Sequence, residues 1–164
     1  MKTKDLMIPI KKYLKPENTI KEAVNFLQIN KGDKEWQGGA VLPVLNQAEA
    51  VVGILSIHDI LKAVHPSYLS MTEADLGNFT WDGMVESLAK EAENKMIGAF
   101  MTTNVATVRG NDSLMECVDL MIKRNVHQLL VLDNSDKIIG MIYERDIFYA
   151  ITELMLEKKK EDKA

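Results

Sequence analysis

The sequence predicts an α+β fold built from two similar halves, each with the order strand, helix, strand, strand, helix. Residues 6–28 align without gaps on residues 100–122, and residues 39–64 align without gaps on residues 126–151. The helix-start and turn signals between the apolar segments recur at matching places. An internal repeat of this kind indicates that both halves adopt the same local structure.

Each half begins its first helix with the same signal. Thr19 with Glu22, and Ser113 with Glu116, have the spacing of a capping box, in which a hydroxyl and a carboxylate satisfy free backbone amides at a helix start. Apolar residues follow at helical spacing. They are Ile20, Ala23, Val24 and Leu27 in the first half, and Leu114, Cys117, Val118 and Met121 in the second. A short strand is expected before each helix, around residues 12–14 and 105–108.

A β-hairpin and a second helix complete each half. Two apolar segments joined by a polar turn are typical of a hairpin. The segments are residues 40–45 and 51–55 in the first half and 128–132 and 138–142 in the second, with turns at 46–49 and 133–136. The second helices are expected to begin near Ser56 and near Tyr143.

Each half has only about 50 residues, too few to bury a satisfactory core alone. We therefore expect the halves to pack around a pseudo-two-fold axis as one module. Its parts are a first repeat at residues 1–65, a partly helical linker at 66–99, a second repeat at 100–156 and a charged tail at 157–164. The offset between the halves falls from 94 to 87, so the first half carries seven extra residues within 28–39. A helix is expected at about 84–95.

Composition limits the classes of function. The formal net charge of the 164 residues is -4, so no basic field favours nucleic acid. No apolar stretch approaches the roughly 18 residues of a membrane span, so no membrane insertion is expected. The single cysteine, Cys117, excludes an internal disulfide, and the N-terminal residues lack the apolar core of a signal peptide. A cytoplasmic location is the resulting expectation.

Three segments resemble the tandem cystathionine-β-synthase (CBS) domain pair, also called a Bateman module. They are residues 53–60, residues 140–147 and residues 100–108. The resemblance implies a regulatory, non-enzymatic protein that binds an adenosine-containing effector such as AMP, ATP, NAD or S-adenosylmethionine in the clefts between repeats. It also implies a homodimer that signals to a partner protein of unknown identity. No covalent cofactor is expected.

The same resemblance implies the ligand-binding residues. Asp59 and Asp146 are candidate ribose ligands, and Ser56 is a candidate phosphate neighbour. The other candidates are Thr102, Asn104 and Val105, which would face Asp59, and His127 and Arg145, which would approach phosphate. Asp146 would face residues 8–10, a poorer set of polar groups, so the Asp59 cleft is expected to be the better one. Alternatively, each aspartate only complements the amides of its helix start, and His127 is a strand-end residue.

Rival interpretations of the chain remain. A ligand-free dimerisation or scaffold module is favoured by Tyr143, which replaces the hydroxyl residue Ser56 in the second half. A DNA-binding regulator is a weaker rival. His58, His65, His127 and Cys117 lack zinc-ligand spacing, so no metal site is expected. The sequence has neither a glycine-rich phosphate loop nor a nucleophile elbow, so no catalysis is expected. Two apolar stripes predict the homodimer: Ile57, Leu61 and Val64, and Phe148, Ile151, Leu154 and Met155. The aromatic residues Trp36, Tyr68, Phe79 and Trp81 are expected to pack on the module's own edge or to dock a partner.

Overall fold

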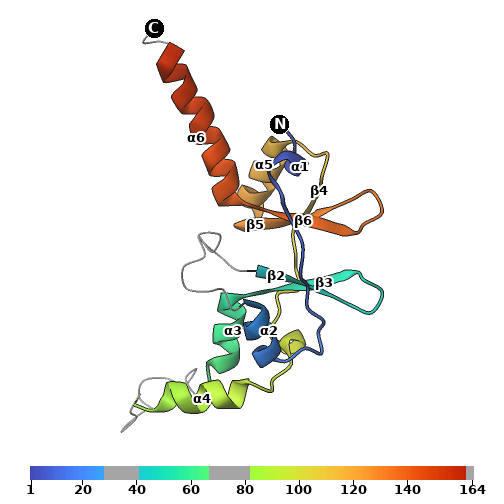
Figure 1. The fold of residues 1–164 in the computed structure, drawn as a ribbon, viewed down its shortest axis with the longest axis vertical. Helices are drawn as coiled ribbons and strands as arrows, with labels where there is room; N and C mark the ends of the chain where they lie inside the picture. Colours follow the sequence, from blue (N-terminus) through green and yellow to red (C-terminus); the bar gives the residue numbers. More distant parts are fainter. Residues whose placement is uncertain (28–40, 67–81, 162–164) are drawn as a thin grey trace. The chain divides into compact units, whose positions relative to one another are not determined.

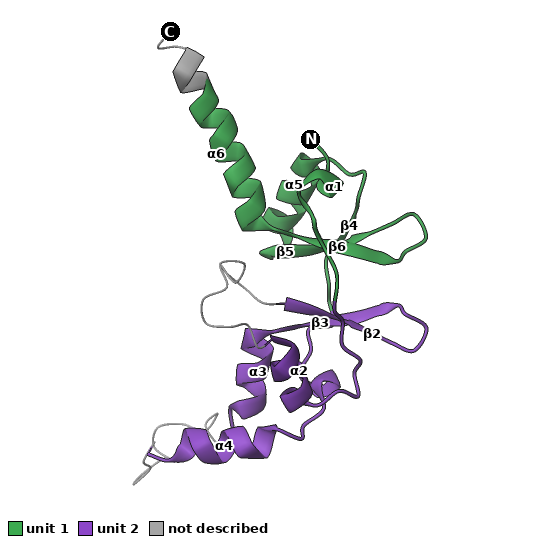
Figure 2. Ribbon diagram, in the orientation of Figure 1, with its two compact units in different colours: residues 1–11, 104–164 green, residues 12–103 purple. Residues whose placement is uncertain are grey.

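The computed structural model describes residues 1–27, 41–66 and 82–161, without the side chains of 158–161 (Figure 1). The chain forms two compact units, one made of residues 1–11 and 104–164 and the other of residues 12–103 (Figure 2). We call them unit 1 and unit 2. The first eleven residues therefore belong to the unit built from the second repeat. The seven-residue insertion and the aromatic residues Trp36, Tyr68, Phe79 and Trp81 lie outside the described residues.

Unit 2 contains the helices and hairpin of the first repeat. Its elements are α2 (Ile20–Leu27), β2 (Val41–Leu45), β3 (Val51–Ser56), α3 (Ile57–Val64), α4 (Met84–Ala92) and a 3-10 turn at Ile97–Ala99. β2 and β3 pair antiparallel, with Leu42 opposite Leu55. The short first strand that the sequence predicts is reduced to a single parallel bridge between Leu14 and Val44. The predicted linker helix is present as α4 but ends three residues early.

Unit 1 contains the second repeat in a fuller form. Its elements are α1 (Thr3–Leu6), β1 (Ile8–Pro9), β4 (Thr107–Arg109), α5 (Leu114–Arg124), β5 (Gln128–Leu132), β6 (Ile138–Tyr143) and α6 (Glu144–Glu161). The sheet order is β1-β6-β5-β4, and only the β4–β5 pair is parallel. The predicted order of elements is thus confirmed in this repeat.

Matching local interactions hold both repeats. At the start of α5 the Ser113 hydroxyl accepts from the Glu116 amide at 3.3 Å, and Glu116 Oε2 accepts from the Ser113 amide at 2.7 Å. The predicted capping box of α2 is also present, because the Glu22 amide donates to Thr19 Oγ1 at 3.2 Å. Both hairpins shift register just before the turn, at Val44/Leu45 and at Val131/Leu132. The shared capping boxes and register shifts follow from the repeated sequence.

Each unit has its own apolar core. The buried residues of unit 1 are Ala106, Val108, Cys117, Met121, Leu129, Val131, Ile142 and Ile147. Those of unit 2 are Leu14, Ile20, Ala23, Val44, Leu55, Ala63 and Ile97. Cys117 is a core residue, as its helical spacing predicts, and its Sγ lies 3.1 Å from Thr3 Oγ1. Burial raises the pKa of the Cys117 thiol, so the thiolate form is disfavoured.

A glycine in the second hairpin strand of each repeat brings another segment close. A Cβ on Gly53 would lie 2.8 Å from the Thr102 carbonyl oxygen, and a Cβ on Gly140 would lie 2.8 Å from the Ile8 carbonyl oxygen. Ile54 and Thr102 exchange backbone hydrogen bonds of 2.9 Å in both directions. This close approach places Thr102 beside the start of α3.

Candidate functional site

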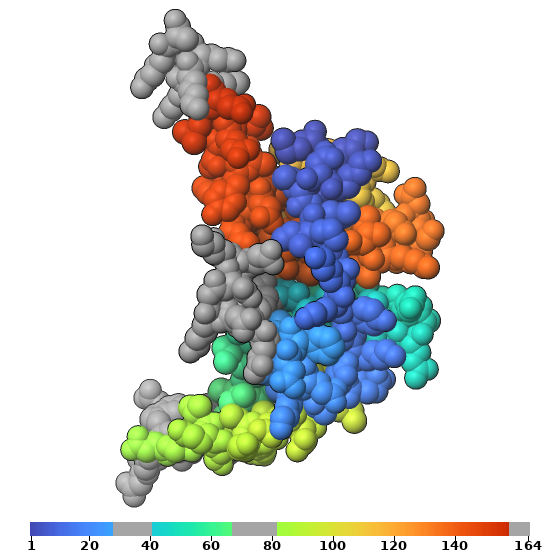
Figure 3. All heavy atoms as spheres, viewed as in Figure 1, coloured from blue at the N-terminus to red at the C-terminus, as the bar shows by residue number. Residues whose placement is uncertain are grey.

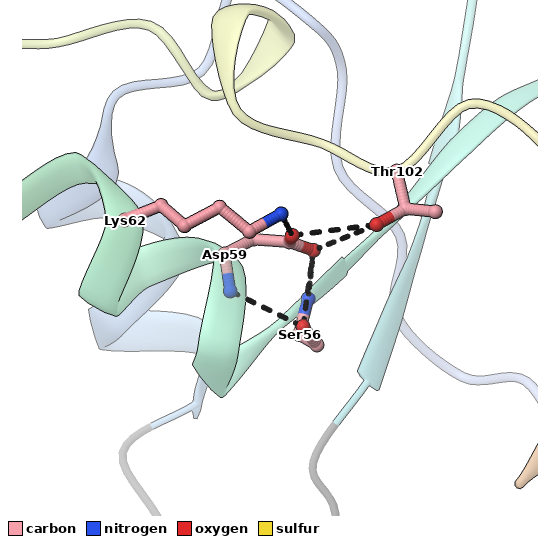
Figure 4. Close-up of polar contacts among 4 residues, drawn as sticks. All are labelled: Ser56, Asp59, Lys62 and Thr102. Atoms are coloured by element: carbon pink, nitrogen blue, oxygen red, sulfur yellow. Dashed lines mark hydrogen bonds and ion pairs between the residues drawn. The ribbon is translucent and has the colours of Figure 1, made fainter. Parts of the chain in front are cut away.

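The start of α3 holds a carboxylate surrounded by donors (Figure 4). Asp59 Oδ2 accepts from the Ser56 amide at 2.9 Å and from the Ser56 hydroxyl at 3.0 Å, while the Asp59 amide donates to Ser56 Oγ at 3.2 Å. Lys62 Nζ lies 2.8 Å from Asp59 Oδ1. Thr102 Oγ1 lies 3.3 Å from Oδ1 and 3.4 Å from Oδ2, so its hydroxyl can donate to either oxygen. Asp59 therefore has donors on both carboxylate oxygens.

Local sequence explains this geometry. Ser56 is the N-cap residue of α3, and Asp59 is the third helical residue, so together they form a capping box. Lys62 follows three residues later, on the same face of the helix. Among the described contacts of Asp59, only the one with Thr102 comes from a distant part of the chain. One turn of helix thus supplies most of the partners of Asp59.

The electrostatics of Asp59 reflect both burial and these donors. The Asp59 side chain is 1% exposed. Burial raises the pKa of its carboxyl, but hydrogen bonds from Lys62 and Ser56 and the charge of Lys62 outweigh burial, so the pKa lies below its ordinary value. The carboxylate is ionised and compensated inside the unit.

The equivalent position in unit 1, at the start of α6, is different. Asp146 Oδ2 and Arg145 Nη1 are both buried and have no hydrogen-bond partner among the residues described. Tyr143, which stands where the first repeat has Ser56, donates its hydroxyl to Met141 Sδ at 3.7 Å. Burial and the charge of Asp146 raise the pKa of the Tyr143 phenol, against the effect of Arg145. Two consecutive residues of the described chain thus carry a buried acceptor and a buried donor without hydrogen-bond partners.

The remaining candidate residues also lie in unit 1. His127 Nδ1 lies 2.9 Å from Glu144 Oε2, and both side chains are largely exposed. Arg124 Nη2 donates to Asn104 Oδ1 at 2.6 Å. Val105 is half-buried. Asn104 and Val105 thus belong to a different unit from Asp59, whereas Thr102 shares its unit and contacts it.

Lys62 is a residue of this site that the sequence analysis missed. Its signal is the i, i+3 spacing from Asp59, which favours an ion pair on one helix face. Lys62 also lines a cavity of about 470 Å³ between α3 and α4, together with His65, Ser87, Leu88, Lys95 and Phe100. The Lys95 ammonium donates to the Ala63 carbonyl oxygen at 2.9 Å.

The described ranges are residues 1–27, 41–66 and 82–161. They contain no group of three or more His, Cys, Asp or Glu side chains placed to hold a metal ion. They also contain no helix with the length and apolar character that crossing a bilayer requires. The polar groups at the two helix starts remain the strongest candidates for ligand contact.

Comparison with known families identifies the class of protein. The CBS domain model matches residues 4–66 and 97–153, so the chain belongs to the CBS domain family and carries two copies of the domain. The uncharacterized protein MJ1426 of Methanocaldococcus jannaschii is 29% identical over 120 residues, 66% of this chain and 71% of that protein.

Solved structures share the tandem fold. CBSX2 of Arabidopsis thaliana, solved in complex with AMP, has a TM-score of 0.62 at 21% identity and covers 94% of this chain and 98% of its own. The CBS domain pair of protein MJ0100, solved with 5'-methylthioadenosine and S-adenosyl-L-methionine, has a TM-score of 0.61 at 21% identity, covering 93% and 97%. These likenesses confirm the predicted CBS-pair fold.

Proposed function

We propose that this protein is a regulatory module that binds an adenosine-containing ligand at the strand-to-helix junctions of its repeats and signals to a partner protein. The observation that carries the proposal is a pair of buried polar atoms at the start of α6, Asp146 Oδ2 and Arg145 Nη1, which have no hydrogen-bond partner among the described residues. Buried polar groups are rarely left without partners, so each such group calls for an explanation. A bound polar ligand supplies one.

The chemistry of these groups fits a nucleotide. A carboxylate only accepts hydrogen bonds, which suits the two neighbouring hydroxyls of a ribose. A guanidinium is a fixed donor that suits phosphate or carboxylate oxygens. His127 lies beside the start of α6, because the Glu144 amide donates to its carbonyl oxygen at 2.9 Å. We therefore assign Asp146 to ribose and Arg145 and His127 to the anionic part of the ligand.

We place Asp146 before Asp59, the reverse of the order that the sequence favours. Both oxygens of Asp59 already have donors, so a ligand there would have to displace them. Ser56 and Thr102 belong to that set of donors, and we keep them with Asp59 as a second, weaker site. Asn104 and Val105 belong to the unit of Asp146, and we keep them in the proposal as candidate ligand contacts.

Relatives support the ligand class. Structures with TM-scores above 0.6 were solved with AMP and with S-adenosyl-L-methionine and 5'-methylthioadenosine. All three molecules share an adenosine moiety with two vicinal ribose hydroxyls. A carboxylate at a helix start is suited to recognise these shared ribose hydroxyls.

Calorimetric titration with AMP, ATP, NADH and S-adenosylmethionine tests the proposal. We expect at least one of them to bind the wild-type chain. Asp146→Ala should weaken that binding, whereas Asp119→Ala, at an exposed acid of α5, should not. Absence of heat with all four ligands at millimolar concentration would contradict the proposal.

A ligand-free dimerisation module is the second candidate, and exposed apolar residues on α6 favour it. Phe148, Leu154 and Met155 are each more than half exposed, and side chains of α6 lie at the surface in the space-filling view (Figure 3). On α3, Leu61 is 59% exposed and Ile57 38%, whereas Val64 is half-buried. Clustered apolar exposure marks an interaction surface.

We propose a homodimer for either function. Sedimentation velocity at tens of micromolar should give the dimer mass, and Phe148→Glu should give monomer. A dimer of this kind should bury at least about 1,000 Å². Only monomer in the wild type would contradict it. A dimer that binds none of the adenosyl ligands would favour the scaffold over the sensor.

A further inference from the structure

The two repeats place different side chains one helical turn after their equivalent aspartates. The offset of 87 that relates the second helices pairs Asp59 with Asp146, and it pairs Lys62 with Tyr149. Both later residues stand at i+3, on the aspartate's face of the helix. A cation therefore follows the acid in α3, and a neutral phenol follows it in α6.

The Lys62 ammonium binds the Asp59 carboxylate at the place where the hydroxyls of a ligand would bind. Its ammonium lies 2.8 Å from Asp59 Oδ1, and the carboxylate is only 1% exposed. The Ser56 amide and hydroxyl hold Oδ2 at 2.9 and 3.0 Å. Among the described contacts, Oδ1 accepts from the side chains of Lys62 and Thr102 and from no backbone amide, so its donors can rotate away and admit a ligand. Lys62 is the charged group bound there.

The Lys62 side chain also has space into which it can rotate. Its side chain is 51% exposed, and it lines the cavity between α3 and α4. A lysine ammonium is a mobile point charge on a four-carbon stem with several rotatable bonds. Rotation away from Asp59 leaves the ammonium in solvent or in that cavity, so the ion pair can open without unfolding α3.

We infer that Lys62 is an internal competitor that blocks Asp59, so that the two aspartates of the module bind ligand with unequal affinity. Asp146 Oδ2 has no partner among the described residues, and the neutral Tyr149 stands at the position that corresponds to Lys62. A ligand at Asp59 binds only the fraction of molecules in which Lys62 has left, and its apparent affinity falls by that fraction. The inference rests on the proposed function, since it concerns the same class of ligand.

The test is an AMP titration followed by NMR, because amide signals report each junction separately. The amides of residues 56–59 report α3, and those of 143–146 report α6. Lys62→Met keeps most of the side-chain stem and removes the charge. Lys90→Met is the matched control on exposed α4, and Lys62→Arg restores a cation. Tyr149→Lys installs the competitor in the other repeat.

In the wild type we expect AMP to shift the 143–146 amides at lower concentration than the 56–59 amides. Lys62→Met should lower the dissociation constant at 56–59 by about tenfold, which corresponds to removing a competitor that holds about nine-tenths of the molecules. Lys62→Arg and Lys90→Met should behave as the wild type does. Tyr149→Lys should weaken binding at 143–146 alone.

Two different results separate failure of this inference from failure of the proposed function. If AMP shifts the 143–146 amides but Lys62→Met leaves the 56–59 titration unchanged, Lys62 is not a competitor and the inference is overturned. The same holds if Tyr149→Lys has no effect on either junction. If AMP and S-adenosylmethionine shift neither junction in any variant, the proposed function is itself rejected, and the inference with it.

Discussion

The starts of α3 and α6 are equivalent positions of the two repeats, but their aspartates have different polar contacts. Both follow a hairpin strand that contains a buried glycine, and both carry an aspartate three residues into the helix. Asp59 has donors on both oxygens, whereas Asp146 Oδ2 has none among the described residues. Repetition of an acid therefore does not repeat its role, because the neighbouring side chains determine which of its oxygens have donors.

The donors themselves differ by substitution between repeats. Ser56 caps α3 and donates to Asp59, but the corresponding Tyr143 directs its hydroxyl to Met141 Sδ. Thr102 reaches Asp59 from the segment that pairs with Ile54, whereas the corresponding residue in front of the first repeat is Ile8, which has no polar side chain. Each change removes a donor from Asp146. The repeats therefore share backbone structure and differ in polar contacts.

The largest effect should come from the feature that the two repeats share. Gly53→Ala and Gly140→Ala should each lower the free energy of unfolding by about 3 kcal/mol, at the upper end of the cost of overpacking. In both cases the new Cβ would stand 2.8 Å from a backbone carbonyl oxygen, which cannot move as a side-chain end can. Urea unfolding measures both. A loss confined to one of the two variants would break the equivalence of the repeats at this level.

Ligand binding should separate the two aspartates. Asp146→Ala should weaken AMP binding at the stronger site by about 1.5–3 kcal/mol, the scale of hydrogen bonds to a charged group. Asp59→Ala should change that binding much less, because the Asp59 oxygens already have donors within the chain. Calorimetry with AMP measures both variants. Equal losses from the two substitutions would contradict the assignment.

Helix capping should affect α3 more than α6. Ser56→Ala should lower the free energy of unfolding by about 1 kcal/mol, the usual cost of losing an N-cap hydroxyl. Tyr143→Phe should cost less, since it removes only a weak 3.7 Å contact with a sulfur. Chemical denaturation of the two variants in parallel checks this. A larger loss from Tyr143→Phe would show that α6 depends on the phenol.

The smallest expected effect is on the pH dependence of the free energy of unfolding. The pKa of Asp59 is lower in the folded chain than its ordinary value, so ionised Asp59 stabilises the fold above the unfolded-state pKa. That contribution is lost as the pH falls through the folded-state pKa. The difference in unfolding free energy between wild type and Asp59→Asn should therefore be constant near neutral pH and shrink below about pH 4. Urea titrations at several pH values measure it. A difference that grows on acidification would have the wrong sign.

Much of the fold could be predicted from the sequence. The capping signals at Thr19 and Ser113, the helical spacing of apolar residues and the polar turns of both hairpins predict elements that the structure contains, because such signals act within a few residues. The first strand of the first repeat was less accurately predicted. Leu14 forms only one bridge to Val44, since pairing depends on a distant strand rather than on local preference.

The candidate site was predicted less completely than the fold. The positions of Asp59, Asp146 and Ser56 follow from the repeat, but Lys62 was overlooked, although its i+3 spacing was readable. The contact between Thr102 and Asp59 agrees with what the family resemblance implies. That Asp146 Oδ2 has no partner among the described residues could not be predicted from the sequence. It depends on the positions of all the side chains that pack around this oxygen.

By itself, the sequence determined the elements, their order, their duplication and the residues that start each helix, since these depend on spacing along the chain. Only the tertiary structure decided that both Asp59 oxygens have donors, whereas Asp146 Oδ2 has none among the described residues. Residues 1–11 join the second repeat's unit and Thr102 joins the first repeat's, so the strand before each helix pairs with a segment far away in sequence. In the first repeat that segment brings the Thr102 hydroxyl to Asp59. Hydrogen bonds require contact within about 3.5 Å, and for distant residues that proximity is fixed by packing.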